Sequence, residues 1–189
     1  MAAQLHVLTN GYADDRVAST VTLIIDGSQV TVVDPGMVAD RSAILHPLDE
    51  LGISPVEVTD VVLSHHHPDH TINVALFPNA RVHDHQAIYR DDVWEDADAD
   101  GDGRLVSPGV RLIATPGHTP QDISTLITTA EGLVVCTHLW WHAAGPADDP
   151  YAEDREVLRL QRERILALDP TLVVPGHGAP FSVSATTPR

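Results

Sequence analysis

Histidines in this chain gather in four short segments, and each segment follows directly on an apolar run that is typical of a β-strand. Twelve histidines occur among the 189 residues. The four segments are Ser64-His65-His66-His67-Pro68-Asp69-His70, Thr115-Pro116-Gly117-His118-Thr119, Cys136-Thr137-His138 and Pro175-Gly176-His177-Gly178. Imidazole nitrogens and carboxylate oxygens are the groups with which proteins bind divalent transition metals. Because strand ends can converge on one rim of a sheet, the pattern predicts a metal site assembled from all four segments.

The local sequence favours presentation of these side chains on one side of the backbone. In an extended segment His65, His67 and Asp69 point the same way, because side chains alternate along a strand. His66 then points away, and we expect it to have a structural role. A glycine before His118 and another before His177 let the backbone turn sharply. The alternative is a set of unrelated surface or core histidines. It suits a single Gly-His pair but not four segments that all lie at strand ends.

Short apolar runs separated by turn residues predict the strands that must position these segments. The predicted strands cover residues 20–26, 29–34, 59–63, 81–83, 110–114, 123–128, 133–136 and 172–174. Helices are predicted over residues 41–51, with Asp40 as N-cap, and over residues 152–168. The apolar stripe of the second helix comprises Val157, Leu158, Leu160, Ile165 and Leu168. The acidic stretch 91–103 is expected to be a loop. Grouped strands with interspersed helices favour sheets covered by helices over a strict βαβ array.

The charge balance restricts the partners. Asp and Glu number 27 against 11 basic residues, all of them Arg, and the formal net charge is −16. Such a chain repels phosphate backbones and anionic membranes, so we expect a small-molecule partner, with neither nucleic acid nor membrane bound. A homodimer is one option for its assembly. The sequence shows no long apolar span and no basic, signal-like N-terminus, and its single cysteine, Cys136, cannot form an internal disulfide. A single cytoplasmic domain over residues 1–189 is therefore expected.

Several of these motifs resemble those of one known family. The segment from His65 to His70 matches the HxHxDH signature of the metallo-β-lactamase fold superfamily, and the segments around His118 and His177 resemble its second and last metal motifs. Val33-Asp34-Pro35-Gly36 resembles the early turn that supports the metal-binding loop in that family. The layout is similar to the small single-domain group called metallo-β-lactamase domain-containing protein 1. The resemblance implies an α/β (α+β) fold, a four-layer αββα sandwich with the metal site between its halves.

The resemblance also implies two sets of metal ligands. They are His65, His67 and His118 for the first metal, and Asp69, His70 and His177 for the second. The cofactor would be one or two Zn²⁺ ions, with iron or manganese possible. Three histidines around tetrahedral zinc leave one position for a water that ionises near neutral pH and attacks a carbonyl, or less readily a phosphorus centre. Asp69 would also act in catalysis by orienting that water or moving its proton.

The chain departs from the family at His138. Family members carry Gly-Asp after the equivalent strand, and that aspartate bridges both metals, whereas this chain has Thr137-His138. A neutral imidazole has one lone pair, so it cannot bridge as a carboxylate does. We expect one tightly held metal or two of unequal affinity, with His138 either ligating a metal or hydrogen bonding to its water. Cys136 is an alternative, softer ligand. It lies two residues before the position that aligns with the family's aspartate, and this difference disfavours it.

Three residues that follow the third segment are candidates for the substrate pocket. Trp140, Trp141 and His142 either form a wall of that pocket or belong to a packed loop, and the sequence leaves both interpretations open.

The expected function is hydrolysis of a small ester, thioester or lactone by a metal-dependent enzyme. A phosphodiesterase or nuclease is an alternative, because nuclease activity is tied to the single-domain group, but the negative charge opposes it. An iron-dependent persulfide dioxygenase needs two histidines and a carboxylate on one face, and the usual carboxylate is replaced by His138. A non-catalytic metal-binding domain is the remaining alternative.

Overall fold

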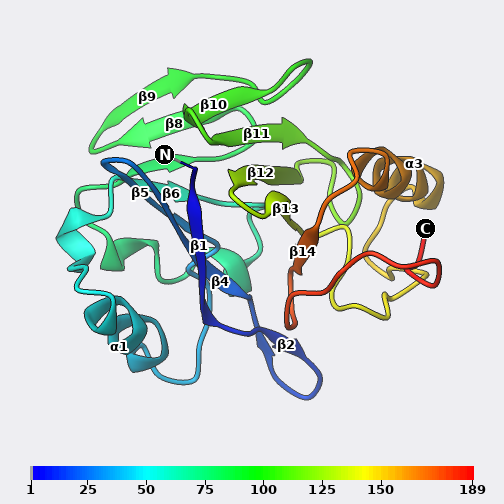
Figure 1. Cartoon of the computed structure of the whole chain (residues 1–189), viewed down its shortest axis with the longest axis horizontal. Coiled ribbons are helices and arrows are strands. Elements are labelled where there is room, and N and C mark those ends of the chain that lie inside the picture. Colours follow the sequence, from blue (N-terminus) through cyan, green and yellow to red (C-terminus); the bar gives the residue numbers. More distant parts are fainter. Residues whose placement is uncertain (1) are drawn as a thin grey trace.

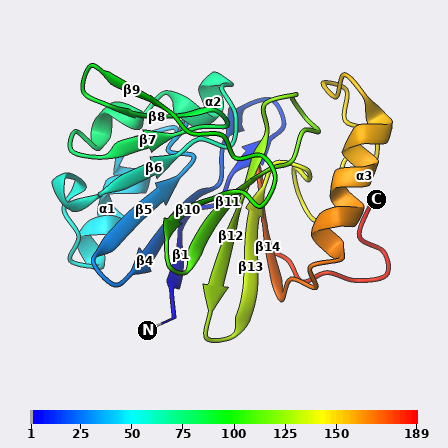
Figure 2. The same ribbon diagram turned by 90° about the horizontal axis from the view of Figure 1, so that it is seen from above.

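Two β-sheets stacked against each other form the frame of the molecule (Figure 1, Figure 2). The computed structural model describes residues 2–189, so Met1 of the predicted domain lies outside it. The seven-stranded sheet has the order β1 (Gln4–Thr9), β4 (Val21–Asp26), β5 (Gln29–Val33), β6 (Asp60–Val62), β7 (Arg81–His83), β8 (Ala87–Arg90) and β9 (Val93–Asp96). The five-stranded sheet runs in order through β10 (Arg104–Ser107), β11 (Val110–Ala114), β12 (Ile123–Thr129), β13 (Gly132–Thr137) and β14 (Leu172–Pro175).

Helices cover the outer faces of both sheets, as Figure 2 shows. On the seven-stranded sheet lies α1 (Ser42–Glu50), whose Ile44 and Leu48 pack in one apolar cluster with residues of β4, β5 and β6. On the five-stranded sheet lies α3 (Arg155–Leu166), whose Leu158 and Ile165 pack against β11, β13 and β14. A third cluster, which includes Ile24 of β4 and Leu112 of β11, fills the space between the sheets. The predicted αββα sandwich is therefore confirmed.

Smaller elements complete the fold. They are the hairpin of β2 (Tyr12–Ala13) and β3 (Val17–Ala18), the one-turn helix α2 (Pro68–Thr71), and the 3₁₀ turns η1 (Pro55–Glu57) and η2 (Val74–Leu76). No helix in the described part of the chain is long and apolar enough to cross a bilayer.

Strand direction brings the histidine segments to one edge of the sandwich. Strands β5, β6 and β7 are mutually parallel, so the residues that follow β5 and β6 emerge at the same edge. Strands β11 and β13 each lie antiparallel to β12, and β14 is parallel to β13, so these three strands also end together. The backbone N–H of Ile123 donates to the carbonyl oxygen of Ser64 over 2.9 Å and joins the two sheets at this edge. Topology alone therefore places the four segments near one another.

Two of the sequence-based predictions need correction. The acidic stretch 91–103 is not a continuous loop, because β9 forms within it and pairs antiparallel with β8. The apolar stripe predicted for the helix over residues 152–168 is also narrower than expected. Leu160 is 48% exposed, and Leu168, which is 41% exposed, lies beyond the end of α3 at Leu166. The buried guanidinium of Arg162 takes part of that helix face and donates hydrogen bonds to the carbonyl oxygens of Leu139, Pro146 and Ala147. These are local differences within the predicted architecture.

The helix boundaries differ slightly from prediction. Arg41, not Asp40, is the N-cap of α1, although the Asp40 carboxylate still accepts a hydrogen bond from the backbone N–H of Ser42 over 2.8 Å. The long helix begins after Asp154, whose carboxylate accepts hydrogen bonds from the backbone N–H groups of Glu156 and Val157. Aspartate at this position satisfies N–H groups that the first helical turn leaves without partners.

Two leucines of α3 test this packing. Leu158 is 2% exposed and belongs to the cluster beneath the helix, whereas Leu160 is 48% exposed. We expect Leu158→Ala to lower the free energy of unfolding by about 2–5 kcal/mol, because it leaves a cavity. Leu160→Ala should change it by no more than about 0.5 kcal/mol. Urea unfolding of both variants measures the difference, and equal losses would contradict the assignment of the buried face.

Candidate metal centre

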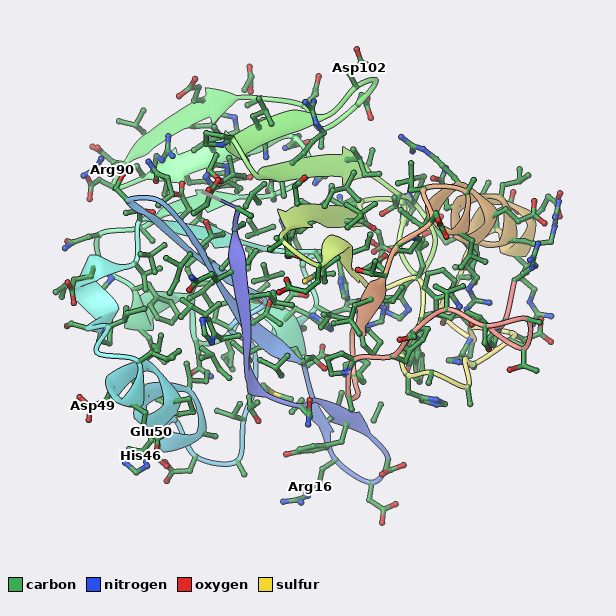
Figure 3. All side chains as sticks on the ribbon, viewed as in Figure 1. Arg16, His46, Asp49, Glu50, Arg90 and Asp102 are labelled. Carbon is green, nitrogen blue, oxygen red and sulfur yellow. The ribbon has the colours of Figure 1, made fainter. Side chains whose placement is uncertain are left out.

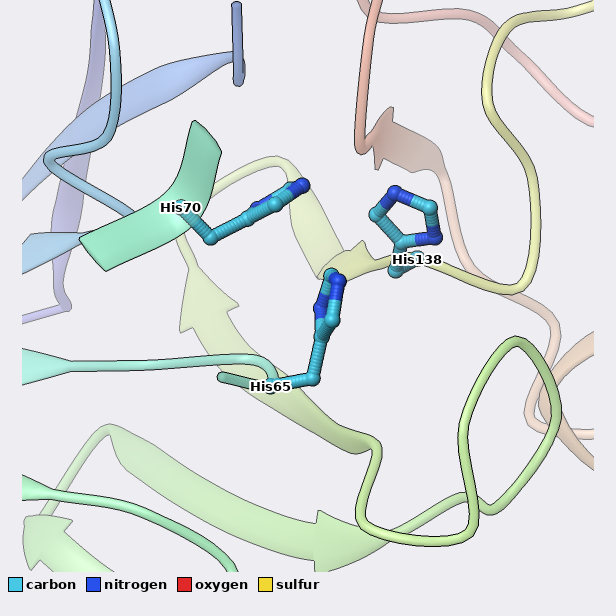
Figure 4. Close-up of side chains that lie close together, drawn as sticks. All are labelled: His65, His70 and His138. Carbon is cyan, nitrogen blue, oxygen red and sulfur yellow. The ribbon is translucent and has the colours of Figure 1, made fainter. Parts of the chain in front are cut away.

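All four histidine segments meet at the rim of the sandwich. Figure 4 shows three of the rings, from His65 after β6, His70 on α2 and His138 after β13, directed at one shared space. The ligand atoms of these three residues lie within 4.8 Å of one another. Each of the three is buried. The convergence predicted from the sequence is thus present.

The first cluster contains His65, His67 and His118. The distance from His65 Nε2 to His67 Nδ1 is 3.0 Å, and that from His118 Nε2 to His67 Nδ1 is 3.1 Å. A tetrahedral zinc ion bonded to three nitrogens at its usual distance would place those nitrogens about 3.3 Å apart. The spacing of the nitrogens is therefore close to that of a zinc site.

The second cluster contains Asp69, His70 and His177. The Oδ2 atom of Asp69 lies 3.4 Å from His70 Nε2 and 3.5 Å from His177 Nε2. His70 Nε2 is buried and has no hydrogen-bond partner. Asp69 lies in the first turn of α2 rather than in an extended segment, so it joins this cluster and not the side of His65 and His67. Pro68 explains the difference, because proline is favoured in the first turn of a helix.

Oxygen atoms outside the clusters determine which histidine nitrogens can bind a metal. Four histidines have Nδ1 within hydrogen-bond distance of an oxygen on the side away from the cluster. The pairs are His65 with Ser64 Oγ at 3.0 Å, His70 with Asp34 Oδ2 at 2.9 Å, His118 with Asp149 Oδ2 at 2.8 Å and His177 with the carbonyl of Ala18 at 2.9 Å. An imidazole that donates from Nδ1 keeps its lone pair on Nε2. Four such lone pairs facing one another fit a bound cation.

The electrostatic environment supports this interpretation. Burial, together with the neighbouring imidazoles, lowers the pKa of His65 far below its ordinary value and that of His177 to about 4, so both rings are neutral at pH 7. Burial acts in the same direction on His70, but the charge and hydrogen bond of Asp34 outweigh it and raise the pKa of His70 to about 9. Burial would raise the pKa of Asp69, yet the neighbouring His70 lowers it to about 2. Without a metal, His70 is therefore protonated on both nitrogens at pH 7, and a cation bound here would replace the proton on Nε2. This corner of the site favours positive charge.

His138 occupies the middle of the cluster. Its ring centroid lies 4.1 Å from that of His118, 4.6 Å from that of His65 and 4.8 Å from that of His70. His138 Nε2 is 3.0 Å from His177 Nε2, while its Nδ1 is buried and has no hydrogen-bond partner. Because His177 donates from Nδ1, its Nε2 is an acceptor, so His138 donates from Nε2 and carries its lone pair on Nδ1.

Cys136 does not reach the cluster. Its side chain lies in the apolar core between the sheets, with Sγ 3.7 Å from Thr22 Oγ1. Burial raises the pKa of this thiol to about 12, so no thiolate is available. Of Cys136 and His138, only His138 lies where it can contact a metal held by the cluster.

The turn that follows β5 supports the first histidine segment. Asp34 accepts the backbone N–H of Ser64 on one carboxylate oxygen, at 2.7 Å, and faces His70 Nδ1 with the other. Gly36 packs directly against α2, since a Cβ atom there would lie 1.5 Å from the carbonyl oxygen of Asp69. The expectation that this turn supports the histidine loop is met. His66 also behaves as expected, because it points away and binds Asp84 over 3.0 Å.

A cavity of about 820 Å³ opens beside the cluster. Side chains of His67, Asp69, His118 and His177 line it, together with the β2–β3 hairpin, residues 37–39, Trp141 and Tyr151. The rings of Trp141 and Tyr151 stack with centroids 5.9 Å apart. On the hairpin, the guanidinium of Arg16 lies over the ring of Tyr12, at the outer edge of the molecule in Figure 3. A cavity of this size accommodates a small organic ligand.

Only one of the three residues predicted as a pocket wall takes that place. Trp141 lines the cavity, but Trp140 is fully buried in the cluster beneath α3 and donates from Nε1 to the carbonyl of Pro188. His142 is exposed and is not among the residues that line the cavity. Backbone direction after β13 separates these neighbours, so Trp140 and His142 are corrected from pocket to packing and surface positions.

The sequence motifs did not indicate two residues that belong to the site. Asp149 and Tyr151 lie in the irregular segment between β13 and α3, where the sequence has no strand or helix periodicity. The acidic composition of this segment is typical of a solvated loop, so nothing in it indicated a buried carboxylate.

Comparison with known proteins identifies the relatives of the chain. The sequence profile of the Metallo-beta-lactamase superfamily matches residues 14–177. Metallo-beta-lactamase domain-containing protein 1 of Xenopus laevis is 34% identical over 191 residues, which cover 95% of this chain and 81% of that protein. A metallo-beta-lactamase candidate from Thermotoga maritima has a crystal structure with a TM-score of 0.75, 23% identity and coverage of 97% and 100% of the two chains.

A lactone-hydrolysing enzyme shares the same fold. The structure of an N-acyl homoserine lactone hydrolase, with N-hexanoyl-L-homoserine bound at its catalytic metal centre, has a TM-score of 0.68. Its sequence identity is 18%, and the match covers 93% of this chain and 92% of that one.

The two glycines beside His177 test the packing of the site. A Cβ on Gly176 would lie 2.3 Å from Cδ2 of His138, whereas one on Gly178 would lie 3.1 Å from Cβ of His142. We expect Gly176→Ala to displace the His138 ring and to lower the free energy of unfolding by about 1–3 kcal/mol. Gly178→Ala should cost less. Thermal unfolding and a crystal structure of each variant measure this, and an undisturbed His138 in Gly176→Ala would refute it.

Proposed function

The chain belongs to the metallo-beta-lactamase superfamily, and we propose that it is a metal-dependent hydrolase of a small ester, thioester or lactone. The observation that carries the proposal is the set of Nε2 atoms that converge beside the 820 Å³ cavity, each on a ring whose Nδ1 faces an oxygen. The similarity in fold to a lactone hydrolase makes a lactone one of the substrates to test.

Two ligand sets would hold the metal. In this proposal His65, His67 and His118 bind a first Zn²⁺, and Asp69, His70 and His177 bind a second. A nitrogen and oxygen donor set of this kind suits zinc, and also iron or manganese. A bound cation polarises a carbonyl oxygen and lowers the pKa of a water molecule toward neutrality.

The side chains around the cavity would position the reacting groups. Asp69 lines the cavity and stays ionised, because its pKa is lowered to about 2. Its ionised carboxylate accepts a hydrogen bond from a water molecule and orients that water toward the substrate carbonyl. Trp141 and Tyr151 hold the apolar part of the substrate and keep bulk water away from the reacting carbonyl.

The charge of the molecule favours a small carbonyl substrate over nucleic acid. The net charge is −16, and acidic residues such as Asp49, Glu50 and Asp102 project from the surface in Figure 3. Phosphate contacts need clustered cations. Among the residues that line the cavity, Arg16 is accompanied by Asp14 and Asp15 on the same hairpin. We therefore expect no appreciable binding of DNA or RNA.

One observation keeps a second activity under consideration. The cluster of Asp69, His70 and His177 has two histidines and one carboxylate, the set that non-haem iron oxygenases use. An iron-dependent persulfide dioxygenase is thus the second candidate. The sequence motifs already assign these three residues to the second metal, but they disfavour the dioxygenase because His138 replaces the carboxylate that this chemistry usually uses.

Replacement of His118 tests the proposal. We expect the protein purified without added zinc to contain metal, and metal to raise the melting temperature because it binds only the folded state. His118→Ala should lose most of the metal and its hydrolysis of chromogenic esters, thioesters and lactones. Elemental analysis, thermal unfolding and this substrate panel measure the effects.

The control is His142→Ala, because His142 is exposed and lies outside the cavity. Unchanged metal content in His118→Ala would refute the first ligand set. Tightly held iron with oxygen consumption on a persulfide, and no hydrolysis, would favour the dioxygenase. Hydrolysis of a phosphodiester alone would favour the phosphodiesterase.

The position of His138 predicts unequal metal sites. A second cation must take the lone pair of His177 Nε2 away from the hydrogen bond of His138, and Asp69 is the single carboxylate in that ligand set. We expect one metal to bind tightly and the second more weakly, and His138→Asp to strengthen the second site. His138→Asn is the matched control, because asparagine has the size of aspartate but carries no charge. Zinc titration followed by calorimetry measures both affinities, and two equal sites in the natural chain would contradict this prediction.

A further inference from the structure

Asp149 connects the metal ligands to the wall of the cavity. Its side chain has 0% exposure. One oxygen, Oδ2, lies 2.8 Å from His118 Nδ1 and also 2.8 Å from Trp141 Nε1. The other oxygen accepts the backbone N–H of Tyr151 over 2.9 Å. We propose that Asp149 is a positioning residue that sets the protonated nitrogen of His118 and the orientation of Trp141 at the same time. This inference rests on the metal site proposed above.

The contacts of Asp149 make it suitable for this role. Oδ2 accepts the Nε1–H of Trp141 and Oδ1 accepts the backbone N–H of Tyr151, so both oxygens act as acceptors. His118 Nδ1, which faces Oδ2, therefore donates and carries the ring proton. The lone pair then lies on Nε2, the atom 3.1 Å from His67 Nδ1. Asp149 thereby directs His118 toward the first metal site.

The segment that carries Asp149 is held in place from the opposite side. Arg162 of α3 donates to the carbonyl oxygens of Pro146 and Ala147, just before Asp149 in the chain. The Asp149 carboxylate therefore has a fixed position against which His118 and Trp141 are aligned. A carboxylate held in this way reduces the entropy that the ligand loses when the metal binds.

The shared oxygen, Asp149 Oδ2, couples metal binding at His118 to ligand binding beside Trp141. Trp141 stacks on Tyr151, and both rings line the cavity. A metal bound to His118 would fix the ring and strengthen its hydrogen bond to Asp149. The fixed carboxylate would then favour the observed position of Trp141. The same coupling must act in reverse, because linkage between two binding sites is reciprocal. We expect metal binding to order the rings of Trp141 and Tyr151. A ligand bound against these rings should in turn raise the affinity of the protein for the metal.

The experiment compares Asp149→Asn with two control variants, Asp148→Asn and Trp141→Phe. An asparagine amide accepts at one atom only and presents an N–H₂ group at the other, so it cannot accept from His118 and Trp141 and also from the Tyr151 backbone N–H. Competition between the protein and a chromophoric zinc chelator should show a 10- to 100-fold loss of first-site affinity, a usual effect of removing such a partner. Asp148→Asn changes a neighbouring carboxylate that is 75% exposed and should bind zinc like the natural chain. Trp141→Phe keeps an aromatic side chain, smaller than the indole, and removes the N–H, and its zinc affinity should fall by less than that of Asp149→Asn.

A spectroscopic readout separates positioning from folding. Nitrogen-15 histidine NMR of the natural chain should show His118 protonated at Nδ1 and not at Nε2, and in Asp149→Asn this preference should be lost. Asp149→Asn that binds zinc as tightly as the natural chain, or a natural His118 protonated at Nε2, would overturn the inference. Failure of the natural chain itself to bind zinc through His118 would refute the proposed function instead, so the two failures are distinguishable.

Discussion

The site depends on where each buried imidazole holds its proton. Ser64, Asp34, Asp149 and the carbonyl of Ala18 face the Nδ1 atoms of four histidines, and the lone pairs on Nε2 are thereby turned toward one another. These oxygens come from four separate places: the ends of β5 and β6, the strand β3, and the segment before α3. The sandwich is the scaffold that keeps such distant oxygens outside one small cluster.

This arrangement is unfavourable for the protein alone. A buried polar atom without a partner costs about 1–3 kcal/mol, and His70 Nε2 and His138 Nδ1 are two such atoms in the described part of the chain. The apolar clusters on both sides of the sheets supply the stability that offsets this cost. Buried polar atoms without partners are rare in proteins, and a bound metal would give these two atoms a partner.

Much of this architecture can be predicted from the sequence, and the physical reasons for the exceptions are clear. Short Val- and Ile-rich runs identify the strands, and the direction of those strands brings His118 and His177 to one edge. Asp149 could not be predicted, because the side chains that it contacts, Trp141 and His118, are 8 and 31 residues away in the chain and its own segment has no periodicity. Nor does the sequence show that Trp141 rather than Trp140 lines the cavity, because tertiary packing decides which of two adjacent tryptophans is buried.

The hydrogen bond from His177 to the carbonyl of Ala18 joins residues that are 159 positions apart. Thr20 also donates to the carbonyl of Gly178 across 158 positions. Contacts between such distant residues form late, because a long loop must close first. During synthesis on the ribosome, His65 and His67 therefore leave the exit tunnel long before His177 can join them. A growing chain offers an early, incomplete set of histidines, and the centre acquires its final composition only when the fold closes.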